Sequence, residues 1–189
     1  MKIIFVRHGE SEHNANRSAE KNTPLTERGR KQATALGEKL KKYRISEIYT
    51  SNLVRSKETG KIISEIVGVP VEGNFEELDE YPGEYLNMNF WKFLHRKTNK
   101  RFKKMGKLLN QISRNRNDNK TILLVAHGIT NRIILGHFLE LPIKKELLRF
   151  NQENTCMNIL FWKPEFKNWS VDCFNDISHL PKGLISKKY

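Results

Sequence analysis

The stretch MKIIFVRHGES, residues 1–11, decides the fold class of this chain. The apolar run at residues 3–6 has the length and the β-branched composition of a buried strand. It stops abruptly at a cation, an imidazole and a glycine, which are Arg7, His8 and Gly9. In α/β proteins with parallel sheets, ligands bind beyond the carboxyl ends of the strands, and these residues stand at such an end.

The same pattern returns far downstream as ILLVAHG, residues 122–128, where a second apolar run ends at His127 and Gly128. One histidine at a strand end is most often a packed or solvated residue. Two strand-His-Gly units instead predict that His8 and His127 meet over one crevice at the edge of a sheet.

Short apolar runs alternate with longer amphipathic patterns along the chain. This alternation predicts crossover connections and a mainly parallel sheet with helices on both faces, that is, a three-layer α/β/α sandwich. Thr26 can cap the first helix, and Glu27 falls in its first turn. The predicted strands are residues 2–6, 47–50, 121–126, 156–162 and 170–174, and the predicted helices are residues 26–43, 53–67, 88–115 and 128–140.

The composition is that of a soluble globular protein, with 38% apolar and 29% charged residues. Since no stretch looks like a linker, we expect a single domain over residues 1–189. The N-terminus lacks a signal-peptide pattern and no run is long enough to span a bilayer, so we expect a cytoplasmic protein without a membrane partner. Cys156 and Cys173 lie outside any metal-ligand spacing, and we expect small, reduced core residues there.

The net charge of +13 is concentrated in residues 95–120, which hold ten Lys or Arg residues and one Asp. Within this segment Phe102, Met105, Leu109 and Ile112 recur at three- and four-residue spacing, which indicates an amphipathic helix. We expect its basic face to be solvated. A face that binds nucleic acid or another polyanion is the alternative.

Residues 7–14, RHGESEHN, fit the R-H-G-x-[S/T]-x-x-N pattern of the histidine phosphatase superfamily, which includes the cofactor-dependent phosphoglycerate mutases. The chain resembles this family over nearly its whole length. The resemblance implies a phosphoglycerate mutase-like fold with a variable helical cap region, about residues 84–120, that sets the substrate. The further matches follow in order at residues 24–29 (PLTERG), 51–59 (SNLVRSKET), 125–128 (VAHG) and 175–180 (NDISHL).

The chemistry of phosphate esters agrees with this resemblance. Attack on phosphorus spreads negative charge over three equatorial oxygens, so a pocket must supply fixed positive groups. Arg7 and Arg55 each offer a planar fork of donors, and His127, if protonated, would offer another donor. By resemblance, neutral His8 attacks phosphorus and forms a phosphohistidine.

Two further residues are candidates for phosphate binding. By resemblance Asn14 contacts the phosphate, and Gly128 lets the backbone approach it closely. Each candidate also has an ordinary explanation: Asn14 could cap a turn, Arg7 and His8 could form a surface pair, and Arg55 could be solvated. The ordered matches favour the phosphate site.

The departing oxygen needs a proton, so the reaction requires a carboxylic acid that later serves as base for water. The acidic segment at residues 75–85 is the place to search, because the family commonly carries the acid in the pattern L-x-E-x-x-x-G. Glu80 stands where this pattern places the acid, although Gly83 arrives one residue early. Glu80 is the first choice, with Glu77 and Glu84 as alternatives.

The expected activity is that of a metal-independent phosphomonoesterase of the histidine acid phosphatase type, acting on a small phosphorylated metabolite through a phosphohistidine at His8. No metal-ligand spacing or nucleotide loop is recognised, so no metal or cofactor is expected. A phosphoglycerate mutase-type phosphotransferase is one alternative, although a mutase needs more covering structure than the short region between Glu80 and His127 offers. A non-enzymatic basic module is the other. The Lys/Arg-rich rim predicts a substrate with several negative charges.

Overall fold

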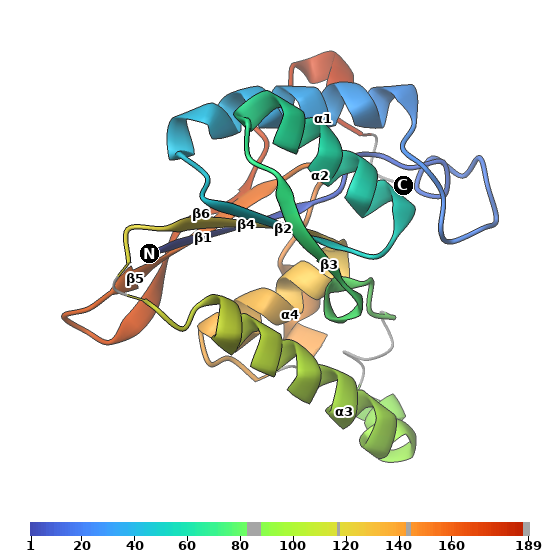
Figure 1. Cartoon of the computed structure of the whole chain (residues 1–189). Helices are drawn as coiled ribbons and strands as arrows, with labels where there is room; N and C mark the ends of the chain where they lie inside the picture. The colour runs from blue at the N-terminus through green and yellow to red at the C-terminus, as the bar shows by residue number, and fades with distance from the viewer. Residues whose placement is uncertain (83–87, 117, 143–144, 187–189) are drawn as a thin grey trace.

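The computed structural model describes residues 1–82, 88–116, 118–142 and 145–186. These residues form a six-stranded sheet with the order β3-β2-β4-β1-β5-β6 (Figure 1). Neighbouring strands from β3 to β1 are parallel, and β5 and β6 are antiparallel to their neighbours. The strands are β1 (Lys2–Arg7), β2 (Glu47–Ser51), β3 (Val71–Phe75), β4 (Thr121–Ala126), β5 (Met157–Lys163) and β6 (Asn168–Asp176).

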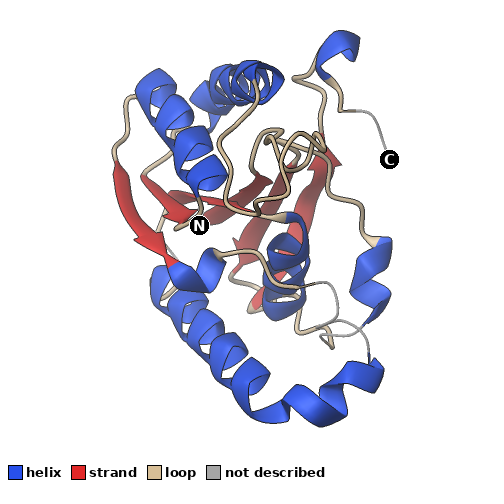
Figure 2. Cartoon of the chain, turned by 90° about the vertical axis from the view of Figure 1, so that its right-hand side faces the viewer, coloured by secondary structure: helices blue, strands red, loops and turns tan. Residues whose placement is uncertain are grey.

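Helices cover both faces of this sheet, which confirms the predicted three-layer sandwich (Figures 1 and 2). The helices α1 (Glu27–Leu40) and α2 (Val54–Val67) lie on one face, and α3 (Met88–Ile112) and α4 (Gly128–Phe138) lie on the other. The side chains of β1 alternate between the two layers, as those of a strand must. Ile4 and Val6 pack with the α1 and α2 side, and Ile3 and Phe5 pack with the α3 and α4 side.

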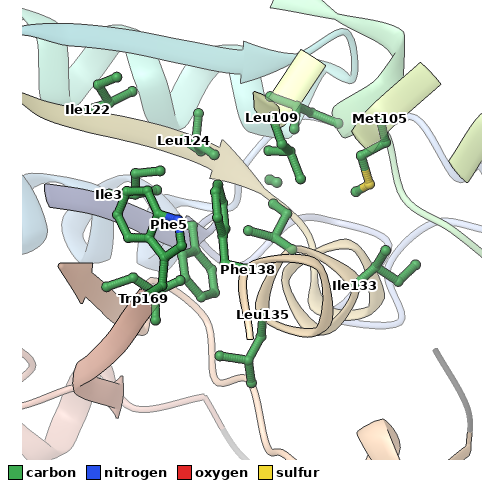
Figure 3. Packing of buried hydrophobic residues seen from close by; sticks show 14 of the residues in the cluster. Ile3, Phe5, Met105, Leu109, Ile122, Leu124, Ile133, Leu135, Phe138 and Trp169 are labelled. Carbon is green, nitrogen blue, oxygen red and sulfur yellow. The ribbon is translucent and has the colours of Figure 1, made fainter. Parts of the chain in front are cut away.

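The core on the α3 and α4 side contains the apolar stripe predicted from the basic segment. Met105 and Leu109 are fully buried against β4 and α4, and Phe102 and Ile112 are partly buried at the margin of the same cluster (Figure 3). Packing of this stripe explains why α3 forms although its other face is strongly basic, because most helical stability in proteins comes from an amphipathic face.

The first helix begins where the sequence predicts and ends slightly earlier. The Thr26 hydroxyl caps it by accepting a hydrogen bond of 3.0 Å from the Gly29 N–H. The α-helix stops at Leu40, and residues 41–43 continue as a 3₁₀ turn that closes at Arg44 with a left-handed φ of 48°. Helix α3 likewise ends at Ile112 rather than at residue 115.

Strand β3 was not predicted from the sequence. Its five residues, VEGNF, include Gly73 and the polar residues Glu72 and Asn74, a composition that is depleted in strands. The strand forms at the edge of the sheet because β2 offers it a parallel partner, and an edge position tolerates polar side chains.

The cysteine prediction is confirmed in part. Both thiols are free, Cys156 is fully buried, and Cys173 is only half-buried. Burial raises the pKa of the Cys156 thiol to about 12, so this side chain behaves as a small apolar residue. None of the described helices is long and apolar enough to cross a membrane.

Candidate active site

The two strand-His-Gly units lie side by side in the middle of the sheet. Strands β1 and β4 are parallel partners, and Arg7 stands opposite Ala126 in their register. The next residues, His8 and His127, therefore leave the sheet at the same edge, as the sequence predicts. Their ring centroids are 5.0 Å apart and the ring planes meet at 60°, and both side chains are almost completely buried.

The hydrogen-bond partners of His8 define its tautomer. The Gly9 carbonyl can only accept, so His8 Nδ1 carries the proton of the 2.6 Å hydrogen bond between them. The Arg55 Nε–H can only donate, so His8 Nε2 accepts that hydrogen bond of 2.9 Å with its lone pair. The neutral ring thus directs a basic nitrogen at the guanidinium of Arg55.

The electrostatics of the site keep His8 neutral. Burial lowers its pKa well below 6.5, and the charges of His127, Arg55 and Arg7 lower it further. Only the hydrogen bond to the Gly9 carbonyl opposes this shift. Nε2 is therefore unprotonated at neutral pH, which a nitrogen nucleophile requires.

His127 is held by a serine at the end of a third strand. Its Nε2 lies 2.7 Å from the hydroxyl of Ser51, the last residue of β2. The Ser51 hydroxyl oxygen also accepts a hydrogen bond of 3.2 Å from the Leu53 N–H, so the serine is itself fixed where it contacts His127.

The other nitrogen of His127 faces the interior of the site. Within the described part of the chain, Nδ1 is buried without a hydrogen-bond partner and lies 4.0 Å from Oε2 of Glu80. Burial and the charges of Arg55, Arg7 and Arg101 lower the pKa of His127 well below 6.5. A bound anion next to Nδ1 would oppose these effects and favour the protonated ring.

Arg7 is supported by a cluster of buried amides. Its Nη1 donates a 2.6 Å hydrogen bond to the Gln152 carbonyl, and the Gln152 side chain is held by Asn131 and Asn158 at 2.9–3.1 Å. The Arg7 Nε–H is buried and has no partner among the described residues. A Cβ added to Gly128 would lie 3.8 Å from this nitrogen, so the glycine stands beside the guanidinium.

Arg55 is in the first turn of α2 and is 5% exposed. Besides its contact with His8, its Nη1 donates a 2.6 Å hydrogen bond to the Lys21 carbonyl. Burial lowers the pKa of Arg55 somewhat, yet a guanidinium stays charged in proteins. Arg7 and Arg55 therefore bring two positive charges to the two histidines.

Glu80 lies between the first turn of α4 and His127. Its Oε1 accepts a 3.0 Å hydrogen bond from the Ile129 N–H in the first turn of α4, and its Oε2 faces His127. Burial raises the pKa of Glu80, although Arg7, the Ile129 N–H and Arg55 act in the opposite direction. The protonated carboxyl therefore persists to higher pH than in an ordinary glutamic acid.

Of the two alternatives to Glu80, Glu77 lies on the rim of a cleft of ≈ 620 Å³ that Glu80 also lines. Glu84 lies outside the described residues, as does Gly83. The cleft rim carries both signs of charge, and one of its lysines, Lys104, is paired with Glu76 at 2.8 Å. Among the described residues, the rim residues from the expected cap region are all basic, and the acids of the rim come from residues 76–80. Its residues are Leu53, Glu76, Glu77, Asp79, Glu80, Lys100, Arg101 and Lys104.

Asn14 is engaged in a local turn. Its Oδ1 accepts a 3.1 Å hydrogen bond from the Ser11 hydroxyl, and its backbone N–H donates a 3.3 Å hydrogen bond to the Ser11 hydroxyl oxygen. This arrangement agrees with the ordinary explanation for Asn14, in which it caps a turn. The contact to phosphate stays a prediction.

The loop after β1 is pressed closely against α1 and α2. A Cβ added to Gly9 would lie 2.5 Å from the Gly29 carbonyl oxygen, which is too close for any side chain. The Gly9 N–H donates a 3.1 Å hydrogen bond to the Thr59 hydroxyl in α2. These contacts fix the backbone that carries His8.

Sequence reasoning missed the residues that support the site. Ser51 could have been found, because it ends strand β2 next to β4, just as His8 and His127 follow theirs. Gln152 and Asn154 lie in a loop without a recognisable pattern, yet the Asn154 amide donates to the His8 carbonyl at 3.1 Å. Among the described residues, no three His, Cys, Asp or Glu side chains group as metal ligands would.

A family model of the histidine phosphatase superfamily (branch 1) matches residues 3–177. The chain belongs to this superfamily. Relatives of this chain include a probable phosphoglycerate mutase GpmB from Photorhabdus laumondii, which is 29% identical over 99% of this chain and 98% of its own length.

Solved structures show the same fold. A phosphoserine phosphatase mutant from Entamoeba histolytica, determined with phosphoserine, has a TM-score of 0.75 and 26% identity over 95% of this chain and 99% of its own. A mycobacterial glucosyl-3-phosphoglycerate phosphatase has a TM-score of 0.68 and 20% identity over 92% and 98% of the two chains. The sequence and the fold thus place this chain among phosphatase and phosphotransferase enzymes.

Proposed function

We propose that this chain is a phosphomonoesterase that acts without a metal through a phosphohistidine at His8. One observation carries the proposal: in the described part of the chain, Arg7 Nε and His127 Nδ1 are buried without hydrogen-bond partners, in one site with His8 and Arg55. Buried polar atoms without partners are rare and call for an explanation. A phosphoryl group would give each of them a partner.

The proposed reaction begins when phosphate enters between the two arginines. Its oxygens accept hydrogen bonds from Arg7 and from the Arg55 Nε–H. Without phosphate, this Nε–H donates to His8 Nε2, so its transfer to a phosphate oxygen frees the His8 lone pair. The negative charge of the phosphate draws a proton to His127, whose ring becomes a further donor. Asn14 and the backbone at Gly128 complete the proposed phosphate site.

His8 Nε2 then attacks phosphorus in line with the departing oxygen. A bond forms from nitrogen to phosphorus while the ester bond from phosphorus to oxygen breaks. Glu80 transfers its proton to the departing oxygen, so an alcohol leaves rather than an alkoxide. Burial raises the pKa of Glu80, which supports this assignment.

Hydrolysis of the phosphohistidine completes the proposed cycle. The Glu80 carboxylate accepts a proton from water as the water oxygen attacks phosphorus, and the bond from phosphorus to His8 breaks. Inorganic phosphate leaves, and His8 and the protonated Glu80 are restored. In this proposal residues 1–189 form one catalytic domain, and α3 belongs to its variable cap region at about residues 84–120.

The proposed substrate is a small phosphorylated metabolite whose remaining atoms occupy the cleft beside Glu80. That cleft offers both cationic and anionic side chains, such as Lys100 and Glu77. The names of the similar proteins refer to phosphoserine, phosphoglycerate and glucosyl-3-phosphoglycerate. Each of these molecules carries a carboxylate close to its phosphate, so carboxylated phosphate esters are the first substrates to test.

The test is hydrolysis of a panel of phosphate esters in excess chelator, followed by acid quench and mass spectrometry of the enzyme. We expect released phosphate and a phosphorylated peptide that contains His8, with both lost in His8→Ala. Exposed Lys57→Met is the control, because it removes a charge from α2 outside the site. Activity that disappears with chelator, or that survives in His8→Ala, would overturn the proposal.

The mutase remains the second candidate, because the curated relative is named as a probable phosphoglycerate mutase. Given 3-phosphoglycerate and its bisphosphate primer, a mutase forms 2-phosphoglycerate faster than free phosphate. We expect the opposite order.

A steep salt-dependent affinity for nucleic acid without turnover of any ester would instead support the non-enzymatic basic module.

A further inference from the structure

One arginine of α3 joins that helix to the loop that carries Glu80. The Arg101 Nη2 donates a 2.7 Å hydrogen bond to the Asp79 carbonyl, and both terminal nitrogens lie 3.4 Å from the Glu80 carbonyl oxygen. A longer contact of 3.5 Å reaches the Glu76 carbonyl. A planar guanidinium can satisfy several carbonyls at once, which an ammonium group cannot do with the same geometry.

The ring of Tyr81 provides a second attachment between Arg101 and this loop. The guanidinium carbon of Arg101 lies 3.7 Å from the centroid of the Tyr81 ring, and the Tyr81 side chain is fully buried. On α3, Phe102 stacks on the same ring with centroids 5.1 Å apart and planes 4° apart. The contact of a cation with a desolvated aromatic face is among the stronger of its kind.

Helix α4 holds the same peptide from the opposite side. The Thr130 hydroxyl donates a 2.9 Å hydrogen bond to the Asp79 carbonyl, which therefore accepts from two helices. The Ile129 N–H holds the Glu80 carboxylate. The loop is thus bracketed, with its backbone fixed by Arg101 and Thr130 and its carboxyl fixed by α4.

We propose that Arg101 is a positioning residue that holds the Glu80 carboxyl at the departing oxygen of the substrate. This inference rests on the proposed function, in which Glu80 is the acid. Proton transfer needs heavy atoms within hydrogen-bond reach, and a displacement of about 1 Å can cost about 100-fold in rate. It follows that α3, a helix of the expected cap region, has two roles. It forms one wall of the cleft, and through Arg101 it determines how efficiently Glu80 transfers its proton.

The test compares two departing groups in Arg101→Met. An alkyl phosphate needs a proton on its departing oxygen, whereas 4-nitrophenolate leaves without one. We expect kcat/KM for glycerol phosphate to fall by about 10- to 100-fold and that for 4-nitrophenyl phosphate to change little. The quantity kcat/KM covers the steps up to departure of the alcohol, so slow hydrolysis of the phosphohistidine does not mask the effect. Arg101→Lys should recover only part of the loss.

The control is Lys103→Met, which removes an exposed charge from the same helix. It should leave both rates and the melting temperature unchanged. Thr130→Val removes the hydrogen bond from α4 to the Asp79 carbonyl and should give the same selective loss as Arg101→Met. This second variant keeps the test decisive if Arg101→Met fails to fold.

A double-mutant cycle with Glu80→Gln shows whether Arg101 acts through Glu80. If it does, adding Arg101→Met to Glu80→Gln produces no further loss on glycerol phosphate. Equal losses on both esters, or additive losses in the cycle, would overturn the inference. Failure of the proposed function is recognised separately, by activity that survives in His8→Ala.

Discussion

The Nε–H of Arg55 donates a hydrogen bond of 2.9 Å to Nε2 of His8, and the Gly9 carbonyl accepts the proton of His8 Nδ1. The same arginine therefore selects the tautomer of His8 and, in the proposed function, binds a phosphate oxygen. In the proposed reaction, a phosphate oxygen replaces His8 Nε2 as the acceptor of the Arg55 Nε–H. The nucleophile therefore becomes available only when phosphate is present.

Replacement of Arg55 tests this relationship. We expect Arg55→Met to lower kcat/KM by about 10²- to 10³-fold, as loss of a donor to transition-state charge does in other enzymes. Arg55→Lys should recover little, because an ammonium group lacks the planar fork. Steady-state kinetics measure the effect, and Lys57→Met serves as the control. Full activity in Arg55→Lys would contradict a role for fork geometry.

Ser51→Ala removes the hydrogen-bond partner of His127 Nε2. We expect kcat/KM to fall by about tenfold, the value of one buried hydrogen bond. Nitrogen NMR of the His127 ring should show a mixture of tautomers in place of one. Ser64→Ala is the matched control, because that hydroxyl bonds the Val69 carbonyl at the far end of α2. An unchanged His127 spectrum in Ser51→Ala would show that Ser51 does not fix the tautomer of His127.

The pH dependence of kcat/KM tests the acid. Burial raises the pKa of Glu80 above 4.5, so the protonated form persists to higher pH than usual and is lost as the pH rises through the shifted value. Activity on an alkyl phosphate should therefore decline along this limb. Glu80→Gln should abolish the limb and lower the rate by about 10²- to 10⁴-fold. Glu77→Gln should keep the wild-type profile, and loss of the limb there would transfer the role to Glu77.

Gly29→Ala tests the close approach that fixes the backbone after β1. A Cβ there would lie 2.0 Å from the Glu10 carbonyl oxygen, and neither backbone can move without disturbing the loop that carries His8. We expect destabilisation of about 1–3 kcal/mol, measured by urea unfolding. Gly183→Ala adds a Cβ with no neighbour within 4 Å and should change stability by less than about 0.5 kcal/mol. Similar values for both variants would contradict the steric argument.

The sequence alone was sufficient for the order of layers and for the meeting of the two histidines. Both followed from local patterns, because a buried strand between polar ends and an amphipathic stripe on a helix are properties of neighbouring residues. Strand β3 was not predicted, because it depends on a partner that is remote in the chain. Its residues have weak strand propensity, and it exists because β2 presents an unpaired edge to it.

What the sequence determined by itself is the chemistry available at one edge of the sheet: two imidazoles and a guanidinium that follow strands, with acids nearby. Only the tertiary structure decided how that chemistry is arranged. It assigned the tautomer of His8 through Gly9 and Arg55, tied His127 to Ser51, and set Glu80 rather than Glu77 against the first turn of α4. These outcomes depend on hydrogen bonds between segments that are remote in the chain, and the direction of such bonds is fixed only when packing brings the segments together.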